Sequence, residues 1–393
     1  MTPWDAIVVG AGPAGSVTAY RLASEGASVL LLDRARFPRD KPCGGGVTLR
    51  ALRQLPFPIE PVVEHSVDSM EFRLGYRSGY VRRSREPLIL MTQRRRLDAY
   101  LAEQAARAGA DFRDGEKVAA VEETPDGYAV KVGEREERCR VLVGADGANG
   151  LVARSLGLGA DPTYGVALEG NLAADQVDEA RYRGRAVVEL GTVPGGYGWV
   201  FPKGDHLNFG VGGWEGEGPA LRDHLQTLCE AHQVPVQSLT DVRGHRLPLR
   251  KPDAPLARGR ALLVGDAAGL VDPLSGDGMY EAFLSARLAA PAALDVLAGN
   301  AGGLEPYDSA LRRQLARLTA ASWGAKHAFD RYPRLAFTLS RPAFVWPVVE
   351  GLLRGDISHP GAAGGIARGP LKVVEGLSRL AGSPGGRYRM EGA

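Results

Sequence analysis

A glycine-rich segment near the amino terminus has the spacing of a phosphate-binding loop. The sequence GAGPAG at residues 10–15 follows an apolar run at 6–9 and precedes a helical pattern over 16–26. A second apolar run, 28–32, ends at Asp33, 23 residues after Gly10. In such a unit the glycines allow a tight turn, close approach of a pyrophosphate and helix–strand packing, while the acidic residue can bind ribose hydroxyls. The helix amino terminus favours phosphate. We therefore predict a dinucleotide site, for which FAD and NAD(P) remain open.

Two later segments share one scheme, in which an apolar strand runs into glycine, aspartate and small residues. The first is VLVGADGAN at 141–149, and the second is LLVGDAAG at 262–269, followed by DPLSGDGM at 272–279. Small residues let a flat ring and its polyol chain approach the backbone. The Asp266 carboxylate is suited to accept a hydrogen bond from a ribityl hydroxyl. A helix starting near Gly276 would stabilise the negative charge of a reduced flavin. These segments favour FAD.

A cysteine before three glycines and a strand with three aromatic side chains are further candidates for chemistry. The cysteine loop is PRDKPCGGG at 38–46, close enough to Asp33 in sequence to reach back along the cofactor. The strand is YGWVFP at 197–202, followed after seven residues by GVG at 210–212. Period two places its three aromatic side chains on one face, suited to an apolar substrate chain. The alternatives are ordinary sheet core and, for the cysteine, a small packed residue without chemistry.

The elements that position these residues indicate an α/β fold that is α+β overall. We expect a Rossmann-type FAD-binding domain from residues 1–65, 90–160 and 250–300. Residues 66–89 and 161–249 are expected to form an inserted substrate domain with an antiparallel sheet. Residues 301–393 are expected to form a helical region.

Composition and charge exclude several classes of protein. The 393 residues include 48 Lys+Arg and 46 Asp+Glu, a net charge of +2 that argues against a nucleic-acid binder. Three scattered cysteines are typical neither of a disulfide scaffold nor of a metal site. The first apolar run is too short for a signal peptide, and no run reaches the ~18 residues of a membrane span. We expect a cytoplasmic protein without a metal, with weak peripheral contact to the inner face of a membrane through residues 335–353.

Together these segments resemble, over residues 1–290, the p-hydroxybenzoate-hydroxylase-like flavoproteins. Arg94 opens an expected helix to 108 and resembles the arginine that this group aims at the FAD phosphates; Arg95, Arg96 or a solvated helix end are the alternatives. The cysteine loop resembles the P-x-x-K-x-C-G-G-G segment of the geranylgeranyl reductase family. The aromatic segment matches that family's Y-x-W-x-F-P-x7-G-x-G pattern. Flavin-dependent halogenases carry a similar W-x-W-x-I-P segment, from which this sequence departs at two positions.

The resemblance implies an FAD-dependent reductase of isoprenoid carbon–carbon double bonds, with Cys43 as the candidate catalytic residue. The residues expected to contact FAD are Gly10, Gly12, Pro13, Ala14, Gly15, Asp33, Arg34, Cys43, Gly44, Gly45, Arg94, Val118, Asp146, Gly147, Gly265, Asp266, Gly276, Gly278 and Met279. The residues expected to line the substrate site are Tyr197, Trp199, Phe201, Pro202, Gly210 and Gly212.

The resemblance does not select one substrate or one electron donor. It implies a geranylgeranyl lipid, a prenyl diphosphate, a chlorophyll side chain or a menaquinone tail. The sequence has no second glycine-rich dinucleotide fingerprint, so the donor is either transiently bound NADPH or a ferredoxin-like redox partner protein. The rival interpretations are an oxygen-using flavin monooxygenase or halogenase, and a flavin-bearing binding protein without activity.

Overall fold

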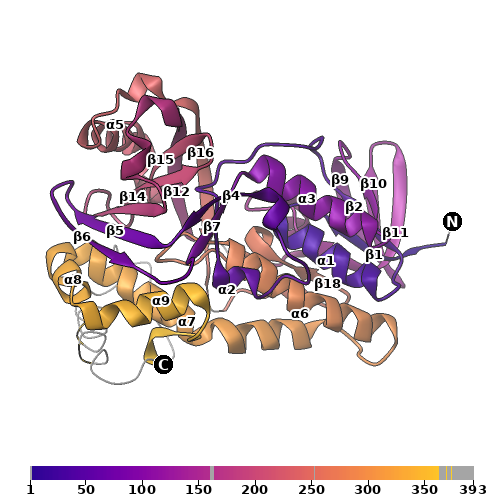
Figure 1. The fold of residues 1–393 in the computed structure, drawn as a ribbon. Coiled ribbons are helices and arrows are strands. Elements are labelled where there is room, and N and C mark those ends of the chain that lie inside the picture. The colour runs from indigo at the N-terminus through magenta and orange to yellow at the C-terminus, as the bar shows by residue number, and fades with distance from the viewer. Residues whose placement is uncertain (1, 160–162, 252, 363–368, 370–372, 374–393) are drawn as a thin grey trace.

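The computed structural model describes residues 2–159, 163–251, 253–362, 369 and 373. Figure 1 shows two sheet-containing parts side by side, with the late helices running beneath both. Within the described residues, no helix is both long enough and apolar enough to cross a membrane.

The first sheet is mostly parallel, because its central strands are short apolar runs that bury both faces. In order across the sheet its strands are β17 (Ala257–Arg258), β18 (Ala261–Leu263), β11 (Arg135–Gly144), β1 (Trp4–Val9), β2 (Val29–Leu32) and β8 (Asp111–Arg113). An antiparallel extension on β11 consists of β10 (Gly127–Val132) and β9 (Val118–Thr124). The buried cluster around Ile7, Leu31 and Val143 forms the core of this part.

Helices and a small sheet complete this part. The helices are α1 (Pro13–Ser24), α2 (Leu49–Leu52), α3 (Arg94–Arg107), α4 (Leu151–Leu156) and α6 (Met279–Leu297). Helix α1 packs against both α3 and α6. The small antiparallel sheet has the order β3 (Gly46–Thr48), β7 (Ile89–Thr92) and β4 (Val63–Val67), and it lies where the two larger parts meet (Figure 1).

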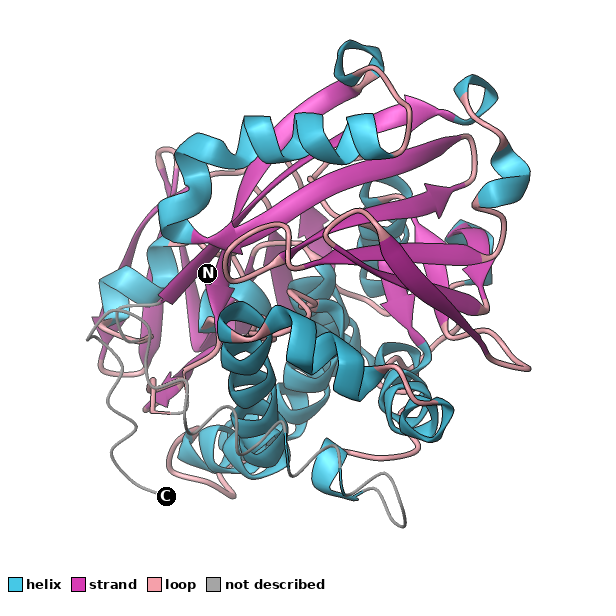
Figure 2. Cartoon of the chain, turned by 90° about the vertical axis from the view of Figure 1, so that its left-hand side faces the viewer, coloured by secondary structure: helices cyan, strands magenta, loops and turns pink. Residues whose placement is uncertain are grey.

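The second large sheet is antiparallel except where β13 and β5 run parallel. Its strands, in order, are β16 (Thr240–Leu249), β12 (Thr163–Ala173), β15 (His206–Trp214), β14 (Tyr197–Lys203), β13 (Arg185–Leu190), β5 (Ser69–Leu74) and β6 (Ser78–Arg83). Figure 2 shows helices on both sides of it. On one face Phe209 and Val211 pack against Leu225 and Leu228 of α5 (Leu221–Ala231).

The late helices cover the other face. They are α7 (Glu305–Arg331), α8 (Pro333–Ser340) and α9 (Trp346–Arg354). Trp346 of α9 joins Phe72, Val188 and Phe201 of the sheet in one apolar cluster. Short 3₁₀ turns are η1 (Glu60–Val62), η2 (Ala174–Gln176), η3 (Glu179–Arg181), η4 (Glu215–Ala220), η5 (Val236–Ser238), η6 (Gly265–Ala268), η7 (Ala343–Val345) and η8 (Pro360–Ala362).

The predicted fold class is confirmed, whereas the predicted domain limits stay a prediction. Of the expected helical region 301–393, residues 301–362 are described. The remainder, apart from residues 369 and 373, lies outside the described residues. Two helix starts differ from the prediction. Helix α1 begins at Pro13 rather than at 16, because proline suits the first helical position. Helix α6 begins at Met279, whose N–H donates to the Asp277 carboxylate at 2.8 Å.

Candidate active site

The three glycines of the first loop have different structural roles. Gly10 has φ +106°, and a Cβ there would lie 2.2 Å from the Ala145 carbonyl oxygen. A Cβ on Gly15 would lie 1.8 Å from the Gly10 oxygen. At Gly12 the nearest atom is 3.7 Å away, on the Arg39 guanidinium. The fold itself therefore requires Gly10 and Gly15, while Gly12 keeps open the space at the amino terminus of α1, as a bound pyrophosphate needs.

Asp33, at the end of β2, already serves the loop. Its carboxylate accepts the N–H groups of Ala11 and Ala35, both at 2.8 Å, and lies 3.8 Å from Arg39. The predicted ribose contact therefore has to share this carboxylate, and it stays a prediction. The neighbouring Arg34 side chain is exposed.

Arg94 is the arginine of its run that turns inward. It makes two hydrogen bonds to buried Asp98, at 2.7 and 2.8 Å, whereas Arg95 and Arg96 are exposed. Burial alone would lower the pKa of Arg94, but Asp98 produces a net rise. Arg39 also reaches Asp98, at 3.0 Å. Two guanidinium groups thus converge on Asp98, and that of Arg39 borders the open space at Gly12. A contact of Arg94 with the FAD phosphates stays a prediction.

The second glycine–aspartate segment meets both the first loop and the cysteine loop. A Cβ on Gly265 would lie 2.8 Å from Ala14, and Lys41 pairs with Asp266 at 3.0 Å. Burial opposes ionisation of Asp266, but Lys41 holds its pKa below the usual range. His245 of β16 lies near this pair, and burial together with Lys41 lowers its pKa to about 4. The site therefore offers a charged aspartate and a neutral histidine at pH 7.

The segment after β11 has a mainly structural arrangement. Asp146 accepts the N–H groups of Leu151 and Val152, at 2.5 and 3.0 Å, and so caps α4. Burial raises its pKa. Gly147 has φ +80°, and Val118, at the start of β9, packs on the core of the first sheet. Contacts of these residues with FAD stay predictions.

The start of α6 is a tight, acidic turn. Gly276 has φ +66°, and Gly278 directly precedes the helix, which Met279 opens. Asp277 accepts the Met279 N–H, and burial, with Asp272 nearby, raises its pKa to about 6. The Tyr197 hydroxyl donates to the Ser275 carbonyl of the same turn. The aromatic strand is thereby tied to the place predicted for the flavin ring.

The aromatic strand has the predicted face. Adjacent ring centroids are 6.0 Å apart for Tyr197 and Trp199, and 6.3 Å apart for Trp199 and Phe201. The Trp199 ring covers Gly210 so closely that a Cβ there would lie 2.1 Å from it, and a Cβ on Gly212 would lie 3.7 Å from it. Gly210 therefore makes room for the tryptophan, whereas 3.7 Å at Gly212 is an ordinary contact. Contacts of the two glycines with substrate stay predictions.

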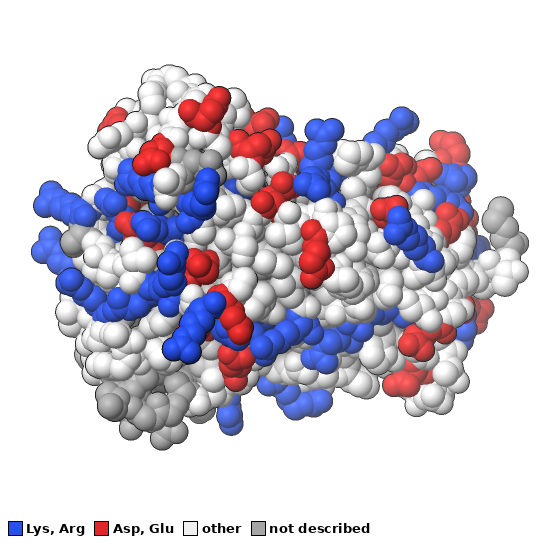
Figure 3. Space-filling view, in the orientation of Figure 1, with Lys and Arg blue, Asp and Glu red and all other residues white. Residues whose placement is uncertain are grey.

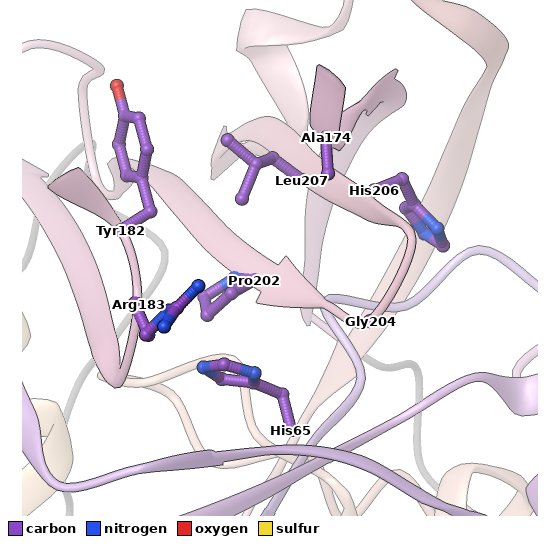
Figure 4. Close-up of a pocket in the computed structure, with 8 residues that line it drawn as sticks. All are labelled: His65, Ala174, Tyr182, Arg183, Pro202, Gly204, His206 and Leu207. Carbon is purple, nitrogen blue, oxygen red and sulfur yellow. The ribbon is translucent and has the colours of Figure 1, made fainter. Parts of the chain in front are cut away.

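Pro202 lies away from this face. It lines a shallow pocket on another side of the β14–β15 hairpin, shown in Figure 4. The lining residues are His65, Ala174, Tyr182, Arg183, Pro202, Gly204, His206 and Leu207. Period two explains the placement, because Pro202 is offset by one residue from Phe201. Pro202 therefore does not belong to the aromatic face, and its predicted contact with substrate stays a prediction.

The cysteine loop packs directly on the aromatic face. A Cβ on Gly44 would lie 3.0 Å from the Phe201 ring and 3.6 Å from Trp199 Nε1. Cys43 is partly buried, and its backbone is bound by Glu169 and Lys203. Sequence reasoning missed both of these residues. Lys203 directly follows the aromatic motif, whereas nothing near Glu169 signals a site.

The contacts above join the predicted flavin residues into one site. The first loop touches Gly265, Lys41 links Asp266 to the cysteine loop, and Gly44 touches the aromatic face. These residues fit FAD: Gly12 leaves space for the pyrophosphate, Asp266 can bind a ribityl hydroxyl, and the start of α6 can face the ring.

Comparison with known proteins agrees with this arrangement. A family model described as an FAD binding domain matches residues 4–322. The chloroplastic geranylgeranyl diphosphate reductase of Oryza sativa is 32% identical over 362 residues, covering 86% of this chain and 76% of the relative. The menaquinone reductase of Mycobacterium tuberculosis is 31% identical over 371 residues, covering 87% and 85%.

Solved structures share the fold. A geranylgeranyl bacteriochlorophyll reductase-like protein from Thermoplasma acidophilum has a TM-score of 0.78 at 22% identity, covering 95% of this chain and 96% of its own. A flavin-dependent brominase has a TM-score of 0.76 at 18% identity, covering 96% and 100%. These likenesses concern fold alone, whereas the family model supports FAD as cofactor and the sequence relatives confirm the predicted family. The chain belongs to the geranylgeranyl reductase family of FAD-dependent oxidoreductases.

Proposed function

We propose that this protein uses FAD to reduce carbon–carbon double bonds of an isoprenoid chain. The observation that carries the proposal is the packing of the cysteine loop against the aromatic face, so close that a Cβ on Gly44 would lie 3.0 Å from the Phe201 ring. Lys41 of the same loop pairs with Asp266 of the flavin segment. A chain lying on the aromatic face would therefore meet both Cys43 and the flavin.

The residues of this chain would position the alkene and exclude water from it. Reduced FAD, when bound, would supply a hydride for one alkene carbon, and a proton would reach the other carbon. Because the alkene is unactivated, the site must hold it close to the reacting groups. Tyr197, Trp199 and Phe201 offer an apolar face, and Phe72 and Val188 extend it beneath α9. We assign to Cys43 the reacting position on the opposite wall.

A basic and apolar surface beside this face favours a lipid-borne substrate. Leu335 of α8 and Phe344 of η7 are 44% and 43% exposed. Arg334 and Arg341 are exposed beside them, and no Asp or Glu occurs within residues 331–349. Figure 3 shows Lys and Arg side chains gathered where Figure 1 places β5, β6 and α8. Such a surface suits weak contact with anionic lipid headgroups.

The decisive experiment concerns reaction class. The enzyme is reduced in an anaerobic chamber and mixed with a geranylgeranyl lipid, with its fully saturated analogue as control. We expect the flavin to reoxidise only with the unsaturated lipid, and the product to gain two hydrogens per double bond. If the flavin stays reduced with every prenyl lipid but turns over with oxygen to a hydroxylated or halogenated product, the monooxygenase or halogenase alternative holds. Supplying NADPH or reduced ferredoxin identifies the electron donor.

The membrane contact has its own test. We expect the protein to float with anionic liposomes, and Leu335→Glu combined with Phe344→Glu to abolish flotation. Val242→Glu is the control, because Val242 is similarly exposed, at 39%, but lies on β16. Protein that stays in the soluble fraction in all forms would indicate a soluble prenyl diphosphate as substrate.

A further inference from the structure

The backbone N–H and the backbone carbonyl of Cys43 are both held by the antiparallel sheet. Its N–H donates to Glu169 Oε1 at 2.6 Å, and its carbonyl oxygen accepts from Lys203 Nζ at 2.7 Å. Glu169 belongs to β12, and Lys203 is the last residue of β14. A loop that leaves the flavin part of the molecule is thus fixed by two charged residues from the substrate sheet.

The surroundings favour this arrangement. Lys203 is only 6% exposed, and burial raises the pKa of Glu169, with Lys203 and the Cys43 N–H acting in the opposite direction. Charged partners make shorter and stronger hydrogen bonds than neutral ones. Neither side chain is bound to the thiol itself, which accepts a weak contact from the Gly45 N–H at 3.4 Å.

The glycine two residues after Cys43 is explained by the same lysine. Gly45 has φ +82°, and a Cβ there would lie 2.2 Å from Lys203 Cε and 2.3 Å from the Thr92 oxygen. The lysine stem therefore passes directly over Gly45. Thr92 in turn donates its N–H and hydroxyl to the Gly45 carbonyl, at 2.8 and 3.1 Å. The loop and the lysine are built around each other.

We propose that Glu169 and Lys203 are positioning residues that fix Cys43 for the reaction; this inference rests on the proposed function. Glycine-flanked backbone has many accessible conformations. Chemistry at an alkene carbon requires reacting atoms ~3–3.5 Å apart and aligned. Holding the N–H and the carbonyl of Cys43, which belong to the two peptide groups on either side of its Cα, restricts the rotation of the loop that would carry the thiol away from the substrate, while leaving the sulfur free.

The test uses three variants of the FAD-loaded enzyme. Glu169→Ala removes the acceptor, Glu169→Gln keeps an acceptor oxygen, and Lys203→Met keeps the stem but removes the donor. Glu215→Gln is the control, because Glu215 is an exposed carboxylate of η4 that pairs with Arg246 at 3.1 Å, away from Cys43 in the sequence and on another element. Two rates are measured: anaerobic flavin reoxidation by a geranylgeranyl lipid, and alkylation of Cys43 by iodoacetamide, followed by peptide mass analysis.

We expect unchanged FAD content and unchanged flavin reduction in all variants. Reoxidation should slow about tenfold or more in Glu169→Ala and Lys203→Met, and less in Glu169→Gln. Alkylation of Cys43 should accelerate about threefold or more as the loop opens. Because both side chains hold the backbone of one residue, Cys43, the double variant should be hardly worse than either single variant.

Three results would overturn the inference. The first is unchanged rates in both Glu169→Ala and Lys203→Met, and the second is faster alkylation of Cys43 with unchanged flavin reoxidation. The third is a double variant of Glu169→Ala and Lys203→Met in which the two losses of rate multiply. Failure of the proposed function looks different. In that case wild-type flavin is not reoxidised by any prenyl lipid, yet the alkylation rates still report whether the two residues hold Cys43.

Discussion

Replacing Gly12 by serine should separate flavin binding from folding. Gly12 has φ −76° and ψ −175°, which any residue adopts, and it caps α1 without a side-chain hydrogen bond. Serine is a preferred N-cap, so the exchange changes helix stability by only a few tenths of a kcal/mol. The added Cβ meets nothing nearer than the Arg39 guanidinium at 3.7 Å. The free energy of unfolding of the FAD-free variant should lie within about 0.5 kcal/mol of the wild-type value.

Gly15→Ser is the matched control, because it adds the same side chain three residues later. There the Cβ would lie 1.8 Å from the Gly10 carbonyl oxygen and 2.9 Å from the Ala145 Cβ. Relieving such overpacking moves backbone and costs about 1–3 kcal/mol or more. Gly15→Ser should therefore lose stability even without FAD.

The binding loss at Gly12 follows from the space that the serine fills. Its side chain lies at the amino terminus of α1, where backbone N–H groups would bind the pyrophosphate. Each hydrogen bond to a charged group is worth about 1.5–3 kcal/mol, so losing one weakens FAD binding about 10- to 150-fold.

Two measurements on the same preparations check both halves of the argument. Urea unfolding of the FAD-free proteins gives stability, and titration with FAD, followed by flavin fluorescence, gives affinity. At FAD 100-fold above its Kd, wild type should gain about 2.7 kcal/mol, and Gly12→Ser much less. Wild-type FAD affinity in Gly12→Ser, or instability equal to that of Gly15→Ser, would refute the reasoning.

Three further predictions concern the reaction and the pH dependence of stability. Cys43→Ala should keep FAD and the wild-type rate of flavin reduction but slow anaerobic flavin reoxidation by substrate about tenfold or more, as stopped-flow absorbance would show. If the variant matches the wild-type rates of both steps, Cys43 is a packing residue. Trp199→Ala should weaken the binding of long prenyl substrates more than that of short ones. The loss of binding free energy should be less than the ~3–5 kcal/mol of a core truncation, and equal losses for long and short substrates would place the ring in the sheet core. Burial lowers the pKa of Lys326 from 10.5 to about 8. Between those pH values the unfolded chain binds the proton that the folded chain lacks, so wild type should gain up to about 3 kcal/mol over Lys326→Met as pH rises; a pH-independent difference in urea unfolding would contradict this.

Local patterns in the sequence predicted much of the fold. The apolar run at 6–9 lies in β1, that at 28–32 forms β2 from Val29 onward, and the helix expected from Arg94 to 108 ends one residue earlier, at Arg107. The aromatic face follows from period two alone. The same period would also have placed Pro202 on the opposite face, but the family motif grouped it with its neighbours. The motif thus carried less information about direction than the strand did.

The contacts of the site that were missed are long-range. Glu169 stands 126 residues from Cys43, and only the order of β12 and β14 across the sheet brings it there. Asp33 was predicted from its place at the end of a strand, but its carboxylate also accepts backbone N–H groups. Sequence spacing identifies a carboxylate, whereas its remaining hydrogen-bonding capacity depends on loop geometry.

The aromatic strand is positioned from outside at its first turn as well as beside Cys43. The Gly195 N–H donates to Asp330 at 2.6 Å, and its carbonyl accepts from Lys326, so α7 holds the backbone of Gly195 on both sides of its Cα, as β12 and β14 hold that of Cys43. Trp214 also donates to Asp330, at 3.0 Å, beside the Lys326 ammonium. Because Tyr197 lies two residues after Gly195, a displacement of α7 would move the aromatic face relative to the flavin segment. Helix α7, which carries no recognised motif, therefore helps to position the aromatic face.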